Sequence, residues 1–218
     1  GVERFMQYFF LQAKVVGSLT GVFLAQLDEQ FAKKQRGGLF SAFRSKARKV
    51  RGYPINGERV GVPSEDWFGS DPVRLLEIFV VADAEGLEVH PDAMRLAARD
   101  ARLIDAAVRK EPRANALFME LLTSRNNPEV VLRWLNEAGI FGRFVPDFGR
   151  VNAQMQFDMY HHYTVDEHTI RAIGLLARIE KGEMKDEHPL ANAIIHQVQS
   201  RRALYVAVLL HDICKGRG

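Results

Sequence analysis

The chain has 218 residues, 47% of them apolar and 26% charged, which excludes a disordered, collagen-like or repetitive protein. Its single cysteine excludes an internal disulfide and favours a reducing, cytoplasmic location, and no apolar run reaches the roughly 18 residues of a membrane span. The net charge of +3 arises from one segment, because residues 31–57 hold eight basic residues and no acidic one.

Apolar residues at helical spacing predict a long first helix over residues 3–32. Residues 33–68 are predicted to form an irregular connection, most of which (about 33–66) is a basic linker. The alternative for its basic residues, which lie between 33 and 51, is a surface that binds phosphates or an acidic partner. No stretch alternates with a period of two, so the sequence predicts no strand.

Prolines predict five later helix starts, because the fixed φ of proline suits a first helical turn and its missing N–H is not needed there. They are Pro72, Pro91, Pro112, Pro128 and Pro189. Asp71 and Asn127 are predicted N-caps, and Gly86 and Gly139 are predicted C-terminal caps. The first four of these helices are predicted over residues 72–84, 91–108, 112–124 and 128–138. An irregular apolar connector is expected after Gly139, and the fold class is all-α: a multi-helix array over residues 1–150.

A second helical unit is predicted over residues 151–218. Thr164 and Glu167 have the spacing of a capping box, which predicts a helix from 165 to 181. A short helix over 189–198 is expected to follow. The last helix, from about residue 201, is apolar on nearly every side and is therefore predicted to be buried and central.

The residues that carry the most chemistry lie in this second unit. His211 and Asp212 end the last apolar helix, where ionisable groups need partners or a metal. Imidazole with carboxylate suits Mn, Fe, Co, Zn or Mg, and the alternative is a hydrogen-bonded core pair. His168 precedes the pair by 43 residues, in the first turn of an earlier helix. This arrangement opens the pattern of HD metal-dependent phosphohydrolases, and Lys215 and Arg217 would offer positive charge to a phosphoryl oxygen.

Two strings in this unit closely resemble the bifunctional protein-PII uridylyltransferase/uridylyl-removing enzymes. They are Tyr163-Thr-Val-Asp-Glu-His-Thr169 and His211-Asp-Ile-Cys-Lys-Gly-Arg-Gly218. The resemblance covers essentially the whole chain and is strongest from residue 151 onward. It implies a four-part cytoplasmic enzyme, in which a nucleotidyltransferase domain adds UMP from UTP to a tyrosine of protein PII. An HD domain then hydrolyses the UMP off, and two C-terminal domains sense glutamine.

The resemblance implies that this chain is a fragment of such an enzyme. Residues 1–150 would be the helical region that follows an absent nucleotidyltransferase core, and residues 151–218 the truncated, N-terminal part of the HD domain. His168, His211 and Asp212 would be ligands of a divalent metal, Mg or Mn, and Lys215 a catalytic residue that steadies the phosphate. The family's final metal aspartate lies further downstream, so we expect this fragment to be inactive and to hold metal weakly or not at all.

Two other functions remain open at this point. One is a non-catalytic helical interaction or scaffold module, since residues 1–150 contain no chemical constellation. The other is a generic HD phosphohydrolase that acts on free nucleotides. A nucleotidyltransferase domain upstream in the parent protein would distinguish the uridylyltransferase/uridylyl-removing enzymes from this second alternative. Neither a nucleic acid nor a membrane is an expected partner, because the basic segment lacks interleaved aromatic residues and a recognisable binding module.

Overall fold

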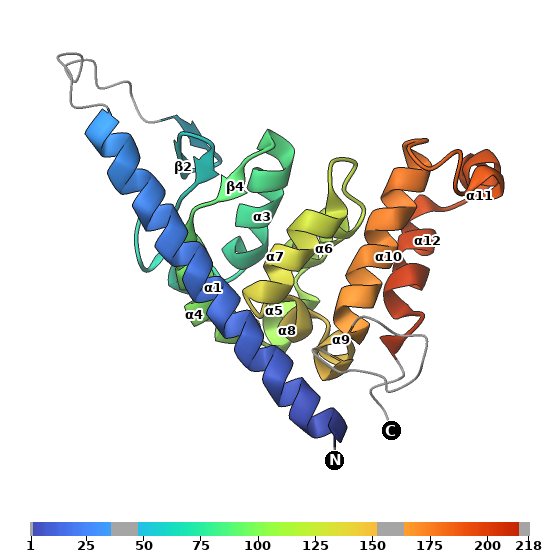
Figure 1. Cartoon of the computed structure of the whole chain (residues 1–218), viewed down its shortest axis with the longest axis horizontal. Coiled ribbons are helices and arrows are strands. Elements are labelled where there is room, and N and C mark those ends of the chain that lie inside the picture. Colours follow the sequence, from blue (N-terminus) through green and yellow to red (C-terminus); the bar gives the residue numbers. More distant parts are fainter. Residues whose placement is uncertain (1, 36–47, 152–163, 214–218) are drawn as a thin grey trace.

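The computed structural model describes residues 2–35, 48–151 and 164–213, and it is mostly helical (Figure 1), which confirms the predicted fold class in its main feature. No helix among these residues has the length and apolar character that crossing a membrane requires. In chain order, the helices and strands are α1 (Val2–Gln35), β1 (Lys49–Val50), β2 (Tyr53–Asn56), β3 (Arg59–Val60), α2 (Trp67–Ser70), α3 (Arg74–Glu85), β4 (Glu88–Val89), α4 (Pro91–Asp100), the 3₁₀ helix η1 (Ala101–Leu103), α5 (Ala106–Lys110), α6 (Pro112–Leu122), α7 (Pro128–Glu137), α8 (Phe141–Phe144), α9 (Pro146–Val151), α10 (Val165–Glu180), α11 (Pro189–Ile194), the 3₁₀ helix η2 (Ile195–Gln197) and α12 (Arg201–Leu210).

The long first helix is present, and α1 crosses one side of the molecule as a single rod that contacts α4 (Figure 1). Many of its apolar side chains remain exposed, including Phe5, Phe9 and Phe23. The helical spacing therefore predicted the secondary structure of this segment, but not the burial of its apolar face.

A small sheet corrects the prediction that residues 33–68 form an irregular connection and that the chain has no strand. β1, β2 and β3 pair antiparallel, and β4 joins β3 in parallel. Two-residue turns join the first three strands and need positive φ angles, which Arg51 (49°), Gly52 (89°) and Gly57 (61°) adopt. The Asn56-Gly57 pair was an available hairpin signal, but the strands are too short to show a clear alternation.

The proline-initiated helices of the array form as predicted, with two corrections. The helix predicted over 91–108 is divided into α4, η1 and α5, because the Asp105 side chain accepts hydrogen bonds from the N–H groups of Ala107 and Val108 and starts a new helix. The connector after Gly139 is not irregular but forms α8 and α9. These helices meet at two glycines, since a Cβ on Gly149 would lie 2.5 Å from the carbonyl oxygen of Gly142.

The predicted caps of this array are largely confirmed. Asn127 accepts a hydrogen bond from the N–H of Val130, and Gly86 and Gly139 have φ angles of 65° and 70°. The Asp71 carboxylate accepts from the N–H of Val73, although the α-helix itself begins at Arg74.

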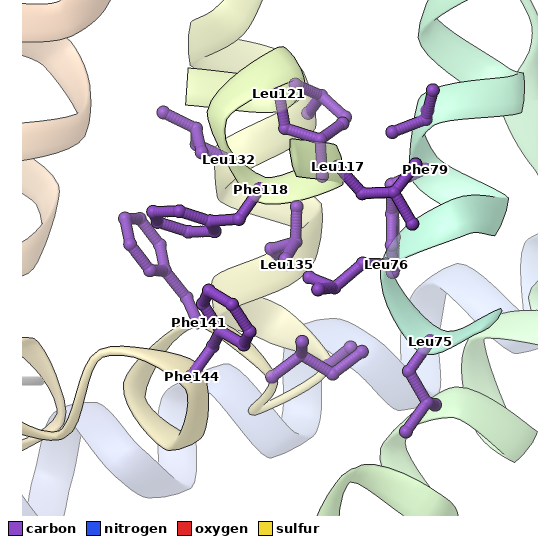
Figure 2. Packing of buried hydrophobic residues seen from close by; sticks show 14 of the residues in the cluster. Leu75, Leu76, Phe79, Leu117, Phe118, Leu121, Leu132, Leu135, Phe141 and Phe144 are labelled. Carbon is purple, nitrogen blue, oxygen red and sulfur yellow. The ribbon is translucent and has the colours of Figure 1, made fainter. Parts of the chain in front are cut away.

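The core lies where α3, α6, α7 and α8 meet. Leucines from α3, α6 and α7 lie near phenylalanines from α6 and α8 (Figure 2), and Phe148 of α9 belongs to the same cluster. The rings of Phe141 and Phe148 stack with centroids 3.9 Å apart, and Phe118 lies against Phe141. The same apolar cluster continues into α10 and α12, so residues before and after 151 share it. The division of the chain at residue 150 stays a prediction.

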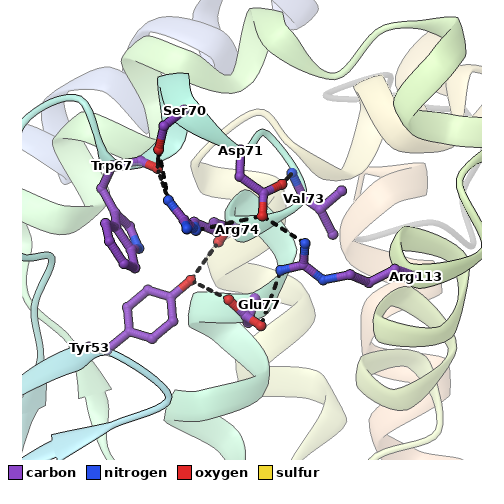
Figure 3. A network of polar contacts seen from close by, with 8 residues as sticks. All are labelled: Tyr53, Trp67, Ser70, Asp71, Val73, Arg74, Glu77 and Arg113. Atoms are coloured by element: carbon purple, nitrogen blue, oxygen red, sulfur yellow. Dashed lines mark hydrogen bonds and ion pairs between the residues drawn. The ribbon is translucent and has the colours of Figure 1, made fainter.

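A polar network joins the sheet to this helical core (Figure 3). The Tyr53 hydroxyl on β2 donates to the Glu77 carboxylate on α3, at 3.0 Å, and burial raises the pKa of Tyr53. Arg113 on α6 reaches Glu77 and also Asp71, with a nitrogen–oxygen distance of 2.7 Å to the latter. The strand β2 and the helices α3 and α6 are thus joined by one polar network, which includes none of the predicted site residues.

Two predictions for the second unit are wrong. Thr164 precedes α10 but makes no side-chain capping bond, and the Glu167 carboxylate instead pairs with Arg133 on α7. The last helix is not central: α12 packs on α10 along one face, where Tyr205 and Leu209 are buried, whereas Leu210 is 45% exposed (Figure 1). The apolar residues on nearly every side of α12 therefore did not correctly predict a central position for this helix.

Candidate metal site

The packing of α12 on α10 brings three of the four predicted site residues together. His168 lies in the first turn of α10, and His211 and Asp212 follow the end of α12. The Nε2 atoms of the two histidines are 3.4 Å apart. The Asp212 Oδ2 atom lies 3.6 Å from the Nε2 of His168 and 3.5 Å from that of His211. Lys215, the fourth predicted residue, is outside the described residues.

This donor set fits one divalent cation. Ligand atoms about 2.1 Å from one ion lie about 3.4 Å apart in tetrahedral and about 3.0 Å apart in octahedral coordination, so the three separations here equal or slightly exceed what one ion requires. The two imidazole nitrogens face each other and could both donate a lone pair to one cation, and the nearby carboxylate adds a negative charge. The part of the chain that the structure describes offers these three ligand groups, which leaves coordination positions for further groups.

A backbone contact sets the tautomer of His211. Its Nδ1 atom is 2.6 Å from the carbonyl oxygen of Val208, one turn earlier on α12. Because a carbonyl oxygen accepts only, Nδ1 must carry the proton, and the lone pair of the neutral ring is then on Nε2. That atom points toward His168 and Asp212, so the helix end presents His211 in the form that binds a metal.

Burial differs among the three side chains and gives the site an open side. The Asp212 side chain is 12% exposed, whereas each histidine side chain is 40% exposed. The carboxylate is therefore the most buried of the three groups, whereas the edges of both imidazoles are exposed to solvent. Whether these residues bind a metal stays a prediction.

Two residues that the sequence analysis did not identify lie behind His168. Asn136 on α7 donates to the Asp166 carboxylate at 2.8 Å, and Arg133 on the same helix donates to Glu167 at 2.6 Å. The two acids directly before His168 thus each contact α7, and neither belongs to the group of His168, His211 and Asp212. Nothing in the local sequence of α7 indicates this role, because its partners lie about 30 residues later.

A second polar cluster joins the C-terminal end of α10 to the N-terminal end of α12, at the helix ends that do not carry the histidines. Arg201 donates to the Glu180 carboxylate at 2.8 Å and to the backbone oxygen of Thr123 at 2.6 Å. The Tyr205 hydroxyl donates to the same carboxylate. The hydrogen bond from Arg201 lowers the pKa of Glu180 below its ordinary value. α12 is thereby held at both ends, by this cluster and by the histidine–aspartate group.

We expect the Glu180–Arg201 pair to make stability depend on pH in acid. Because folding lowers the pKa of Glu180, its contribution is complete above the ordinary value of 4.5 and is lost as the pH falls through the folded-state pKa. Urea unfolding of the wild type and of Glu180→Gln, measured from pH 7 to pH 3, should give a free-energy difference that shrinks below about pH 4.5. Glu183→Gln, at an exposed ion pair, is the control and should change little at any pH. A Glu180→Gln difference that stays constant down to pH 3 would contradict the expectation.

Comparison with known proteins gives relatives along the whole chain. Residues 53–144 match the family model described as the uridylyltransferase GlnD third domain. A protein of Novosphingobium aromaticivorans is 72% identical over 216 residues, which are 99% of this chain and 24% of that protein. A protein of Erythrobacter litoralis is 64% identical, over 100% of this chain and 24% of its own length. A protein of Azospirillum brasilense is 50% identical, with the same two coverages.

All three relatives are named bifunctional uridylyltransferase/uridylyl-removing enzyme. The chain spans about a quarter of the length of these curated relatives. No solved structure matches the chain. The resemblance found in the two sequence strings is therefore confirmed, and it extends through the helices and the small sheet that precede them.

Proposed function

Along its whole length the chain is related to the bifunctional uridylyltransferase/uridylyl-removing enzymes, and from this relationship we propose that it forms one stretch of such an enzyme. The enzyme would transfer UMP from UTP to a tyrosine of protein PII and hydrolyse it off again. This chain would contribute part of the uridylyl-removing site. UTP and glutamine would act through parts of the relatives' length that this chain does not span.

One observation carries the proposal: His168, His211 and Asp212 converge from two helices that are separate in sequence, with donor atoms 3.4–3.6 Å apart. Such a group suits a divalent cation, which we propose to be Mg²⁺ or Mn²⁺. When bound, the cation would polarise a phosphoryl oxygen and lower the pKa of a water molecule.

The chain's own residues would divide the remaining work. The Val208 carbonyl holds His211 in the required tautomer, and the buried Asp212 would supply negative charge to the cation. The exposed imidazole edges leave room for the tyrosyl phosphodiester on the open side of the cluster. Lys215, three residues beyond Asp212, would steady the phosphate as a positive point charge.

Three ligand groups are few for a tightly held cation, and related sites complete their set with a later aspartate. We therefore propose that this chain is inactive by itself and binds the cation weakly. No nucleic acid or membrane partner is proposed for it. The larger enzyme, with its remaining ligands and its PII-binding surfaces, would be the active form.

Removal of the metal tests this function. We expect EDTA to stop the release of UMP from uridylylated PII by the full-length enzyme, and Mn²⁺ or Mg²⁺ to restore it, because the histidine–aspartate group needs the cation. The 218-residue chain, assayed in parallel, should release no UMP under either condition.

Two results would contradict the proposal. Release by the full-length enzyme that persists after exhaustive chelation would exclude a metal-dependent site. Hydrolysis of free nucleotides without release from PII would instead favour a generic nucleotide phosphohydrolase.

A further inference from the structure

The helix α7 packs against α10, the helix that carries His168, and the Glu129 side chain of α7 lies directly against Gly174 of α10. A Cβ atom built on Gly174 of α10 would lie 2.3 Å from the Oε2 atom of Glu129 and 2.7 Å from its Cβ atom. Glycine thus lets the side chains of α7 reach the backbone of α10. In this packing, polar side chains of α7 also contact the first turn of α10 directly.

Two sets of polar contacts, called links below, join α7 to α10. Arg133 donates to Glu129 on its own helix at 3.0 Å and to Glu167 on α10 at 2.6 Å. Asn136, one turn further along α7, donates to Asp166 at 2.8 Å. Asp166 is only 1% exposed and Asn136 only 7%, so the second link lies within the core. Together the two links hold the two residues that immediately precede His168.

The two links influence the direction of the His168 side chain. Successive side chains leave a helix about 100° apart, so the directions of Asp166 and Glu167 determine that of His168. Fixing Asp166 and Glu167 against α7 fixes the rotation of α10 about its own axis, and with it the direction in which the next side chain leaves the helix. A buried carboxylate such as Asp166 is costly without a hydrogen-bond partner, so the link also disfavours other rotations. The imidazole of His168 is itself 40% exposed, so the direction in which the backbone of α10 sends it has a large effect on where its Nε2 atom lies.

We propose that Arg133 and Asn136 are positioning residues for His168, through which α7 sets the cation affinity of the site. The inference rests on the proposed function, since it assumes that His168 is a metal ligand. It also links two stretches of the chain. The match to the third-domain family model ends at residue 144, so α7 belongs to that stretch, whereas the three ligand groups lie after it.

The sign of the effect distinguishes positioning from simple electrostatics. Removing the positive charge of Arg133 near a cation site would by itself strengthen cation binding, because a repulsion is lost. Loss of the link would misplace His168 and weaken binding. Weaker binding after removal of Arg133 therefore reports geometry.

The chain offers a matched control. Arg113 on α6 also bridges two carboxylates, those of Asp71 and Glu77, and belongs to the network of Figure 3, which includes none of the candidate ligands. Arg113→Met should cost stability in the same way as Arg133→Met, but it should leave the cation site unchanged. Comparing the two variants separates a general loss of stability from an effect on His168.

The experiment measures Mn²⁺ binding to the full-length enzyme by the loss of the electron paramagnetic resonance signal of free Mn²⁺. Binding that disappears in His211→Ala/Asp212→Ala belongs to this site, and the rest is subtracted. We expect Arg133→Met to weaken the site-specific binding about fivefold, somewhat below the tenfold or more seen when a direct partner of a metal ligand is lost. Arg133→Lys keeps the charge, but its shorter, flexible side chain has to bring the ammonium group to the place where one guanidinium nitrogen now meets both carboxylates, so it should give an intermediate value. Arg113→Met should match the wild type.

The possible contrary results point to different failures. Equal Mn²⁺ affinity in Arg133→Met, Arg113→Met and the wild type would overturn the positioning role while leaving the metal site intact. Wild-type enzyme that shows no binding sensitive to His211→Ala/Asp212→Ala would overturn the metal site itself, and the positioning role with it. If Arg133→Met does not fold, the Mn²⁺ affinities of Arg133→Lys and Asn136→Leu test the inference instead. Unchanged Mn²⁺ affinity in both variants would overturn it, and weakened Mn²⁺ affinity in both would support it.

Discussion

Replacing His211 and Asp212 together by alanine is expected to abolish the release of UMP from uridylylated PII by the full-length enzyme. Addition of UMP to PII should remain, because it would use a different part of the enzyme. The variant loses two of the three described ligand groups, including the buried carboxylate. We expect a rate loss of about a thousandfold, equivalent to about 4 kcal/mol of transition-state stabilisation. Radiolabelled UMP on PII, followed through both reactions, measures the two activities in one assay.

The control for this variant is Asp186→Ala/His188→Ala. Both of its residues are exposed, and they precede α11 in the same unit of the chain but outside the candidate site. It removes the same two side-chain types and should leave both activities unchanged. Because Asp212 is buried, circular dichroism and a thermal melt should first establish that the double variant is folded. Unchanged UMP release in a folded His211→Ala/Asp212→Ala enzyme would make the pair structural, and the helical scaffold reading would then be preferred.

The second large effect is expected in the core. Phe141→Ala should lower the free energy of unfolding by about 4 kcal/mol, because it leaves a cavity that the rigid helices around it cannot fill. Phe141 is fully buried on α8, and its ring stacks on that of Phe148. Figure 2 shows Phe141 close to Phe118. Equilibrium unfolding in urea measures the change directly.

Phe5→Ala is the matched control for the core variant. It makes the same chemical change on α1, where the side chain is 65% exposed, and should alter stability by less than about 0.5 kcal/mol. A cost for Phe5→Ala as large as that for Phe141→Ala would mean that the apolar face of α1 is packed in solution. A cost below about 1 kcal/mol for Phe141→Ala would contradict the packing of α8 and α9 seen here.

Local signals in the sequence were sufficient for most of the helices. Pro112 and Pro128 start α6 and α7, Asn127 caps α7, and Gly139 ends it with a positive φ. These features depend on neighbouring backbone groups and need no tertiary contact. The small sheet was missed because its strands of two to four residues are stabilised by pairing with one another, including the distant β4, and not by any periodic pattern of their own.

The sequence by itself determined the chemical character of the candidate site. His168 near a helix start and His211 and Asp212 at a helix end are properties of local pattern, and the resemblance to a family of enzymes followed from short strings around them. Only the tertiary structure decided that their donor atoms converge, that Val208 sets the tautomer of His211, and that α7 supports the first turn of α10. The physical reason is the range of the interactions: caps and turns act within a few residues, whereas the Asn136–Asp166 link and the histidine pair join residues 30 and 43 positions apart. Contacts of that kind exist only after the helices have packed.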